Sequence, residues 1–506
     1  MNISTVRDLL SSAATKRPEK VYLCEKDKKG AVISKTFQEF FCDVRKVASF
    51  LSKKNGERVH AGIISSSGIF CITVLLGSMC GAHVAVPVNP RLSLDDICDD
   101  LNRADVTALF YDRSFLEKLD SIKRSCPQII TYVCLDPAEG VFSVGEILSA
   151  NSFAEDKTPK PSDRACILYT SGTTGKRKGV MLSHANLIDN VFCCDNEGDE
   201  NDILLSVLPV HHAYCLTCDV LLSLRYGATL CFNDSPMHLM QDIKLFRPTM
   251  MLFVPQIAQT LYRRMIVAKK TDPLMPVKDV RENVFGGRLR VIFCGGAYLS
   301  PKLVEAYEEM GIPLLQGYGM TECSPRISSS STADPSTGND TGRVVKNCRI
   351  RIVDGEIQVK SPSVMMGYYN DEEATSEMFT SDGWLKTGDL GYVKDEHVYI
   401  TGRKKNLIIL SNGENLSPEE LENRFADYDW ISEVMVCQEG EGITAEVYPY
   451  PEFAGRAEKL LEKAAEEINS TLPPGKRITK LRIRNTGFEK TDSQKIKRRS
   501  LKYTGT

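Results

Sequence analysis

The chain has 506 residues, of which 42% are hydrophobic and 25% are charged, and its formal net charge is -3. This length exceeds what one compact core holds, so two or three domains are expected. The near-neutral charge gives no support to nucleic acid or an anionic membrane as a partner.

The cysteine content indicates a reducing compartment. The chain contains 17 cysteines and opens on an amphipathic stretch without a secretory leader pattern, so we expect reduced thiols in a cytoplasmic protein. Cys215 and Cys218 form an isolated C-x-x-C with no second ligand pair nearby. Structural zinc needs four ligands, so core packing is the favoured interpretation of this pair.

One apolar segment needs comparison with a membrane span. Residues 59–90 contain no Asp, Glu, Lys or Arg, but serines and glycines interrupt them. The uninterrupted part, Ile69–Cys80, is shorter than the roughly 20 residues that cross a bilayer. We therefore predict no transmembrane segment here, but a strand at His60–Ile64, a buried helix, and a second strand at Val84–Val88.

Through most of the chain, short apolar runs alternate with helical stretches. Examples of these runs are residues 203–208, 228–232, 250–254 and 291–294. Such alternation predicts an α/β fold with mainly parallel sheets flanked by helices. Ligands in these folds bind beyond the carboxyl ends of the strands.

The pattern changes toward the C-terminal end. Arg349–Val353 and Glu356–Lys360, joined by Asp354-Gly355, predict a hairpin. Ser417-Pro418-Glu419-Glu420 predicts a helix start in which Ser417 and Glu420 form a capping box. Residues 456–468 predict a charged amphipathic helix. We expect a β-rich subdomain followed by a small α+β domain.

The most informative stretch spans residues 170–180. It contains three glycines, four hydroxyl side chains and three cations, and such groups together bind phosphate. A mobile surface loop is the alternative. The stretch is not a Walker A motif, because only two residues separate Gly172 from Gly175 and no Ser or Thr follows Lys176.

Residues 169–187 resemble the phosphate motif of the adenylate-forming superfamily, which includes acyl-CoA synthetases, luciferases and peptide-synthetase adenylation domains. Further motifs follow in the family's order across nearly the whole chain. The resemblance implies a large ATP- and acid-binding domain at residues 1–403 and a small mobile domain at residues 404–506. It also implies that ATP phosphates bind Thr170, Ser171, Gly172, Thr173, Thr174, Gly175 and Lys176.

Two further motifs imply the rest of the nucleotide site. Gly295-Gly296-Ala297 resembles the loop beside adenine, and Gln316-Gly317-Tyr318-Gly319-Met320-Thr321-Glu322 resembles the family's central motif. Tyr318 is expected to stack on adenine, Thr321 to donate to the α-phosphate, and Glu322 to hold Mg²⁺. A tight turn with a buried tyrosine is the alternative for the second motif.

The C-terminal motifs complete the resemblance. Asp389 matches the family's acceptor for both ribose hydroxyls, a task that suits a carboxylate, and Arg403 is expected near the ribose and phosphate. Gly413 matches the loop beside the pantetheine tunnel of coenzyme A. Lys495 matches the catalytic lysine.

The motif around Lys495 departs from the family pattern at two positions. Glu489 stands where the family has Pro, and Gln494 stands where it has Gly before the lysine. These departures put efficient adenylation in doubt. A basic tail is the alternative interpretation of this segment.

The acid-binding pocket is implied by residues 208–212 and 251–255. His212 is expected to line it, with a neutral core histidine as the alternative. The full set of candidates is mostly apolar: Val210, His212, Cys215, Phe253, Ile257 and Gly317. Because residues 210–215 contain no Asp to pair with an α-amine, we expect a medium- or long-chain fatty acid, with an aromatic acid as the second choice.

The predicted function is ATP-dependent activation of a carboxylic acid to acyl-AMP, followed by acyl transfer to coenzyme A. A carrier protein bearing phosphopantetheine is the alternative acceptor. Two alternatives of another kind are a luciferase-like oxidative enzyme and a non-catalytic nucleotide-binding protein.

Overall fold

The structure is a computed structural model that describes residues 3–55, 58–136, 139–149, 157–170, 177–194, 197–271, 275–336, 338–410, 413–490 and 496–498. The chain divides into two compact units. The first comprises Met1–Ile350 and Val359–Leu385, and the second comprises Arg351–Gln358 and Lys386–Thr506. Residue 403 lies inside the second unit, and the predicted domain division at residues 403 and 404 stays a prediction.

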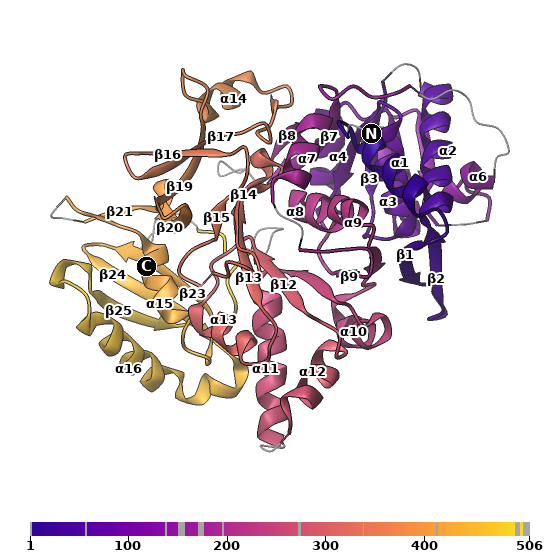
Figure 1. Ribbon diagram of the computed structural model, residues 1–506. Coiled ribbons are helices and arrows are strands. Elements are labelled where there is room, and N and C mark those ends of the chain that lie inside the picture. The colour runs from indigo at the N-terminus through magenta and orange to yellow at the C-terminus, as the bar shows by residue number, and fades with distance from the viewer. Residues whose placement is uncertain are drawn as a thin grey trace. The chain divides into compact units, whose positions relative to one another are not determined.

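The first unit contains two sheets (Figure 1). In the larger one, β10, β9, β11, β12 and β13 pair in parallel, and β2, β14 and β15 add antiparallel pairs. In spatial order its strands are β15 (Arg343–Val344), β14 (Arg326–Ser329), β13 (Leu314–Gly319), β12 (Val291–Gly295), β11 (Met250–Phe253), β9 (Ile203–Ser206), β10 (Thr229–Phe232), β1 (Val21–Lys26) and β2 (Val32–Thr36).

The second sheet has a parallel centre and an antiparallel edge. Its strands in spatial order are β18 (Gly367–Tyr368), β8 (Lys178–Ser183), β7 (Arg164–Thr170), β4 (Val84–Val88), β3 (His60–Ile64), β5 (Ala108–Tyr111) and β6 (Thr131–Cys134). The predicted α/β fold class is confirmed.

Helices cover these sheets and close two apolar cores. Strands β9, β11, β12 and β13 pack against α10–α13 in one core, and β3–β5 pack against α4 and α5 in the other. The helices are α1 (Val6–Lys16), α2 (Phe37–Asn55), α3 (Ile69–Cys80), α4 (Leu94–Arg103), α5 (Leu119–Ser125), α6 (Val144–Ser149), α7 (His184–Phe192), α8 (Ala213–Cys215), α9 (Leu222–Tyr226), α10 (Leu239–Phe246), α11 (Pro255–Thr271), α12 (Val277–Phe285), α13 (Pro301–Glu308) and α14 (Glu372–Met378).

The apolar segment near the N-terminus folds as predicted. The structure has a strand at His60–Ile64, a helix at Ile69–Cys80 and a strand at Val84–Val88. All residues of the helix except Phe70 are buried in the protein. Within the described residues, no helix combines the length and hydropathy of a membrane span.

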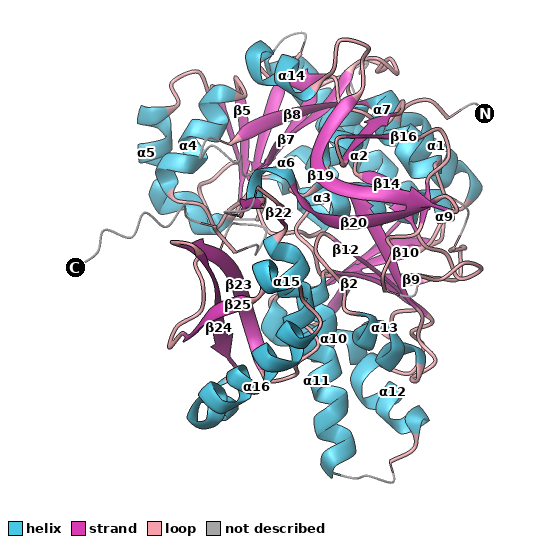
Figure 2. Cartoon of the chain, turned by 90° about the vertical axis from the view of Figure 1, so that its left-hand side faces the viewer, coloured by secondary structure: helices cyan, strands magenta, loops and turns pink. Residues whose placement is uncertain are grey.

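The second unit is built around two antiparallel strands and a small three-stranded sheet. Strands β19 (Leu385–Lys394) and β20 (His397–Arg403) pair with each other, and the predicted hairpin forms as β16 (Arg349–Val353) and β17 (Glu356–Lys360). Strands β23 (Ile431–Glu439), β24 (Gly442–Pro449) and β25 (Ile478–Ile483) share an apolar core with α15 (Pro418–Phe425) and α16 (Ala457–Ser470). Figure 2 shows these strands and helices. A short pair, β21 (Ile408–Ile409) and β22 (Asn415–Leu416), lies between them in sequence.

The start of α15 corrects one prediction. Ser417 is the N-cap residue and Pro418 takes the first helical position, as expected, but the Ser417 side chain makes no capping hydrogen bond. Its hydroxyl instead donates to Glu419 Oε2 at 2.8 Å. The predicted capping box with Glu420 is therefore wrong, because the neighbouring carboxylate captures the hydroxyl.

A buried histidine joins the first turn of α7 to the N-terminal helix. His184 is fully buried, and its Nδ1 accepts a hydrogen bond from the Val6 backbone N–H at 3.3 Å. Among the described residues, its Nε2 has no hydrogen-bond partner. Burial lowers the pKa of His184 to about 4, so the ring stays neutral in the folded protein.

This histidine should make the protein less stable in mild acid. The unfolded chain binds a proton near the ordinary histidine pKa of about 6.5, whereas the folded protein does so only near 4. Stability is therefore lost as the pH falls between these values. His184→Asn keeps an acceptor for Val6 and cannot titrate, so it should reduce the loss of unfolding free energy between about pH 7.5 and about pH 5 by about 2 kcal/mol. Urea unfolding at both pH values measures this. The control is His238→Asn, because His238 is half-buried and lies beside Asp234. An equal effect of the two variants would contradict the assignment.

Candidate active site

The predicted phosphate motif begins at the end of β7. Tyr169 and Thr170 pair with Gly179 and Lys178 of β8 across an antiparallel register. The predicted ligands Ser171, Gly172, Thr173, Thr174, Gly175 and Lys176 lie outside the described residues. After the motif, Ser183 and Asn186 cap α7 reciprocally, with Asn186 N–H donating to Ser183 Oγ at 3.1 Å and Ser183 N–H to Asn186 Oδ1 at 2.9 Å.

The first described cation of the motif has a structural partner. Arg177 Nε lies 2.9 Å from Oδ2 of Asp100, whose side chain is fully buried. Burial raises the pKa of Asp100 to about 7, while the charge of Arg177 opposes that rise. This pair anchors the start of β8 to α4.

Two of the predicted nucleotide motifs lie side by side. Strands β12 and β13 are parallel neighbours, and their register pairs Gly295 with Gly317. A Cβ atom at Gly295 would lie 3.2 Å from the Gly317 carbonyl oxygen, and Gly296 has a φ of +87°. The two glycines therefore allow the strand ends to approach and the chain to turn, leaving Gly296 and Ala297 exposed.

Beyond β13 the chain folds back as β14. The register pairs Gly319 with Arg326, and the Met320 N–H donates to the Pro325 carbonyl at 3.0 Å. Tyr318 is half-buried, whereas Gln316 is buried. The Gln316 Oε1 atom has no hydrogen-bond partner among the described residues.

The predicted metal ligand is a buried carboxylate. Glu322 is 7% exposed, follows Thr321 in a 3-10 turn at Thr321–Cys323, and accepts a hydrogen bond from the Tyr368 hydroxyl at 2.7 Å. Burial and the Glu322 charge raise the pKa of Tyr368. One carboxylate of this kind fits Mg²⁺, which commonly uses one or two carboxylates with phosphate oxygens.

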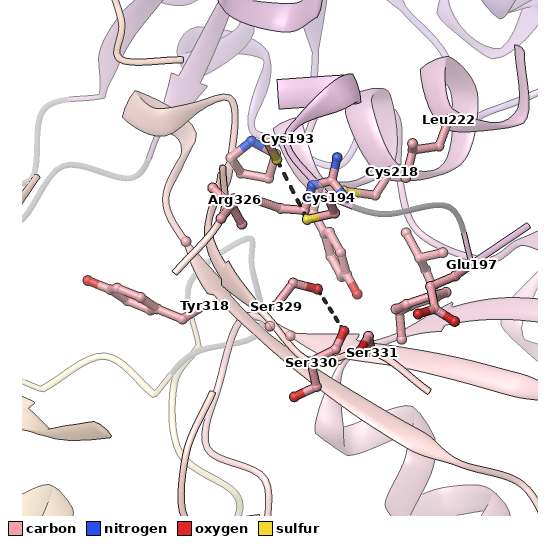
Figure 3. A pocket seen from close by; sticks show the side chains of 18 of the residues that line it. Cys193, Cys194, Glu197, Cys218, Leu222, Tyr318, Arg326, Ser329, Ser330 and Ser331 are labelled. Atoms are coloured by element: carbon pink, nitrogen blue, oxygen red, sulfur yellow. Dashed lines mark hydrogen bonds between the residues drawn. The ribbon is translucent and has the colours of Figure 1, made fainter. Parts of the chain in front are cut away.

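A cavity of about 290 Å³ opens at these strand ends (Figure 3). Gly295, Gly296, Gly317, Tyr318 and Gly319 line one part of it. The remaining wall is mostly apolar or sulfur-bearing, with some polar and charged groups: Cys193, Cys194, Glu197, Leu204, Tyr214, Cys218, Leu222, Tyr226, Met250, Leu252, Phe293, Pro325, Arg326, Ser329, Ser330, Ser331, Arg343, Val344, Val345 and Lys346. Nucleotide-motif glycines and an apolar wall thus share one cavity.

Of the residues predicted to line the acid pocket, one lines the cavity in the structure. Gly317 lines the cavity, but the others are not among the described residues of its wall: Val210, His212, Cys215, Phe253 and Ile257. Val210, Cys215 and Phe253 are buried in the core instead. His212 is half-buried, and its ring centroid lies 4.4 Å from that of His211. Burial, with a smaller contribution from His212, lowers the pKa of His211.

Sequence reasoning missed one wall of the cavity. Tyr214, Cys218, Leu222 and Tyr226 line it from α8, a π-helical segment at Leu216–Leu221, and α9. Their regular spacing of four places them on one helical face. This spacing begins directly after the motif at residues 208–212, and it is the feature of the sequence that could have predicted this wall.

In the second unit, two of the predicted nucleotide ligands are in contact. Asp389 and Arg403 are cross-strand partners in β19 and β20, and Arg403 Nε lies 2.8 Å from Asp389 Oδ1. Asp389 is buried, and its N–H donates to Thr387 Oγ1 at 3.1 Å. Gly413 has a φ of +81°, and a Cβ added there would have no atom within 4 Å among the described residues. Lys495 lies outside the described residues. Lys490 and Ile496, which stand on either side of residues 491–495 in the sequence, form a β-bridge.

Comparison with known proteins shows which family the chain belongs to. The family described as AMP-binding enzyme matches residues 10–369. The chain belongs to the AMP-binding enzyme family. The predicted relationship to the adenylate-forming superfamily is confirmed.

Relatives include the peroxisomal long chain acyl-CoA synthetase 6 of Arabidopsis thaliana, which is 30% identical over 75% of this chain and 64% of the relative. The 4-coumarate-CoA ligase 2 of Narcissus pseudonarcissus is 30% identical over 93% of this chain and 87% of the relative. The chain thus spans slightly less than two thirds of the first relative and most of the second.

Solved structures share the fold. An anthranilate CoA ligase in complex with anthranoyl-AMP has a TM-score of 0.85 at 19% identity, covering 98% of this chain and 96% of that one. The o-succinylbenzoate coenzyme A synthetase of Bacillus subtilis, in complex with AMP, has a TM-score of 0.78 at 25% identity, covering 98% of both chains.

The turn after β13 should tolerate no side chain at Gly319. A Cβ there would lie 2.0 Å from the Pro325 carbonyl oxygen, whereas one at Gly317 would meet only Ser328 O at 3.4 Å. Gly319→Ala should therefore lower the free energy of unfolding by about 1–3 kcal/mol, and Gly317→Ala by less than about 1 kcal/mol. Thermal and urea unfolding of the two variants measure this; equal losses would show that the turn is not tight.

Proposed function

We propose that this protein is an ATP-dependent acid–coenzyme A ligase that works through an acyl-adenylate. One observation carries the proposal: glycines of the two nucleotide motifs line the same cavity as an apolar wall. Such a cavity holds the body of an acid while its carboxylate meets a nucleotide phosphate. Membership in the AMP-binding family supports the same chemistry.

In the first half-reaction, a carboxylate oxygen of the acid attacks the α-phosphorus of ATP. A phosphorus–oxygen bond forms, the bond from the α-phosphorus to the bridging oxygen breaks, and pyrophosphate leaves. Negative charge builds on phosphate oxygens, so catalysis rests on positioning and electrostatic stabilisation. We assign donation to the α-phosphate to Thr321, Mg²⁺ binding to Glu322, and positive charge to Lys176 and Lys495.

In the second half-reaction, the thiol sulfur of coenzyme A attacks the carbonyl carbon of the acyl-adenylate. A carbon–sulfur bond forms, the bond to the phosphate oxygen breaks, AMP leaves, and the thiol proton passes to solvent. We assign the pantetheine passage to the loop at Gly413, which has no side chain to obstruct a thin chain. A phosphopantetheinyl carrier protein is the alternative acceptor.

The substrate acid has a compact, largely apolar body. The cavity volume of about 290 Å³ lies at the lower end of the range for small-molecule sites. It favours an aromatic or medium-chain acid over a long-chain fatty acid. We assign the wall Tyr214, Cys218, Leu222 and Tyr226 to the selection of that body. The cytoplasmic location stays a prediction.

The activity can be tested without knowing the acceptor. Purified protein with ATP and magnesium should exchange labelled pyrophosphate into ATP when an acid from a panel of aromatic and medium-chain acids is added. Adding coenzyme A should then give a thioester and AMP in equal amounts. Acid-dependent exchange without a thioester on coenzyme A would favour the carrier-protein acceptor, and no exchange with any acid would refute the proposal.

Lys495→Ala should separate the two half-reactions. Loss of a positive charge at the reacting phosphate should slow pyrophosphate exchange by at least about 100-fold, while thioester formation from synthetic acyl-adenylate should change little. Lys497→Ala is the matched control, because Lys497 Nζ pairs with Glu489 Oε1 at 2.9 Å. If both variants kept both half-reactions, the assignment of Lys495 would be wrong.

A further inference from the structure

Arg326 brings a positive charge to the cavity wall. It begins β14, opposite Gly319, and its side chain lines the cavity. Figure 3 shows this side chain reaching toward the sulfur atoms of Cys194 and Cys218, while Tyr318 points away from them. The charge therefore lies near these two sulfur atoms.

An asparagine of α7 fixes the orientation of this arginine. Arg326 Nε donates to Asn190 Oδ1 at 3.3 Å, and Arg326 Nη2 donates to the Asn190 carbonyl. Asn190 is fully buried, and its Nδ2 donates to the Cys323 and Arg326 carbonyls at 3.0 and 3.1 Å. The guanidinium is thus held by neutral groups, and its remaining N–H donors are positioned in advance.

No carboxylate of the described residues pairs with Arg326. Glu197 is the one acid among the described cavity residues, and its two carboxylate oxygens accept from the Thr332 N–H at 3.1 Å and the Thr332 hydroxyl at 2.8 Å. Arg343, another cation of the wall, pairs with Asp334. Elsewhere in this unit, shielded Arg177 and Lys26 both have carboxylate partners.

A second cation makes the imbalance larger. Arg225 is close enough for the charge of Arg326 to lower its pKa, after the larger effect of burial. Its guanidinium donates to the Val191 carbonyl at 2.6 Å and the Cys194 carbonyl at 3.2 Å. Shielded charges are normally paired, because leaving one unpaired costs several kcal/mol. This region therefore needs an anion.

We propose that Arg326 binds a second carboxylate on the substrate, so that the protein activates a dicarboxylic acid at one end while holding the other end. This inference rests on the proposed function and names its substrate class. A guanidinium suits the task, since it donates two parallel hydrogen bonds to a carboxylate. The apolar helix face would then contact the hydrocarbon between the two carboxyl groups.

The rival source of negative charge is a cysteine. Cys193 Sγ and Cys194 Sγ lie 3.7 Å apart, and the hydrogen bond from Cys193, followed by the charge of Arg326, lowers the pKa of Cys194 to about 6. A Cys194 thiolate would neutralise Arg326 without any substrate anion. Cys194→Ser separates the two cases, because it removes the thiolate and leaves the arginine.

The test compares glutaric, adipic and suberic acids with their monomethyl esters in pyrophosphate exchange. The wild type should prefer the best diacid over its monoester by at least about tenfold in kcat/KM, the scale of a charge-assisted hydrogen bond in a shielded site. Arg326→Met should abolish that preference by weakening the diacid and improving the monoester. Arg326→Lys should keep part of it, while Cys194→Ser and Arg343→Met should keep it.

Binding gives an independent measurement. The same diacids should raise the Tm of the wild type in the presence of ATP and magnesium, and should not raise that of Arg326→Met. An unchanged diacid-to-monoester ratio in Arg326→Met, a diacid preference that appears only in Cys194→Ser, or a wild type that prefers the monoester would overturn the inference while leaving the ligase proposal intact. Absence of both exchange and a Tm shift with every acid would overturn both.

Discussion

The candidate site depends on the close approach of backbone at the ends of β12, β13 and β14. The parallel register brings Gly295 beside Gly317, and the return of the chain brings Gly319 against Pro325. Side chains at these places would push the strand ends apart. The glycines therefore do more than bend the chain: they set the distance between the strands that border the cavity.

Shielded charge is the second organising feature. Asp100 is held by Arg177 and Asp389 by Arg403, each pair within its own unit. Arg326 differs, because a neutral asparagine holds it. Paired charges of this kind fix a shape, whereas a fixed charge without a carboxylate leaves hydrogen-bonding capacity directed into a cavity. The partner of each charge therefore separates the pairs that hold the fold from Arg326, which has no carboxylate partner among the described residues.

Local patterns were sufficient to predict much of the fold. Apolar runs interrupted by serine and glycine predict the strands at His60–Ile64 and Val84–Val88 and the helix between them. The order of the glycine-rich motifs indicates the family. The capping box at Ser417 failed because Glu419 competes for its hydroxyl. The roles of Lys176 and Lys495 rest on the sequence resemblance alone, since both lie outside the described residues.

The cavity wall was harder to predict, because it depends on contacts between distant segments. Phe253 and Cys215 were expected in the pocket but point into the core, since a strand or helix end alone does not determine which face a side chain takes. Tyr368 reaches Glu322 from 46 positions away. Arg326 looks like an ordinary surface cation in sequence, and only the packing of α7 against β14 shows otherwise.

The helical face formed by Tyr214, Cys218, Leu222 and Tyr226 affects the size of the cavity independently of the glycine motifs. Each of these side chains borders the cavity from a helical segment that contains no residue of the glycine motifs. A larger or smaller side chain there alters the room in the cavity while the strand ends stay in place. Substitutions at these four positions can therefore change the volume of the cavity, one position at a time, without altering the strand ends.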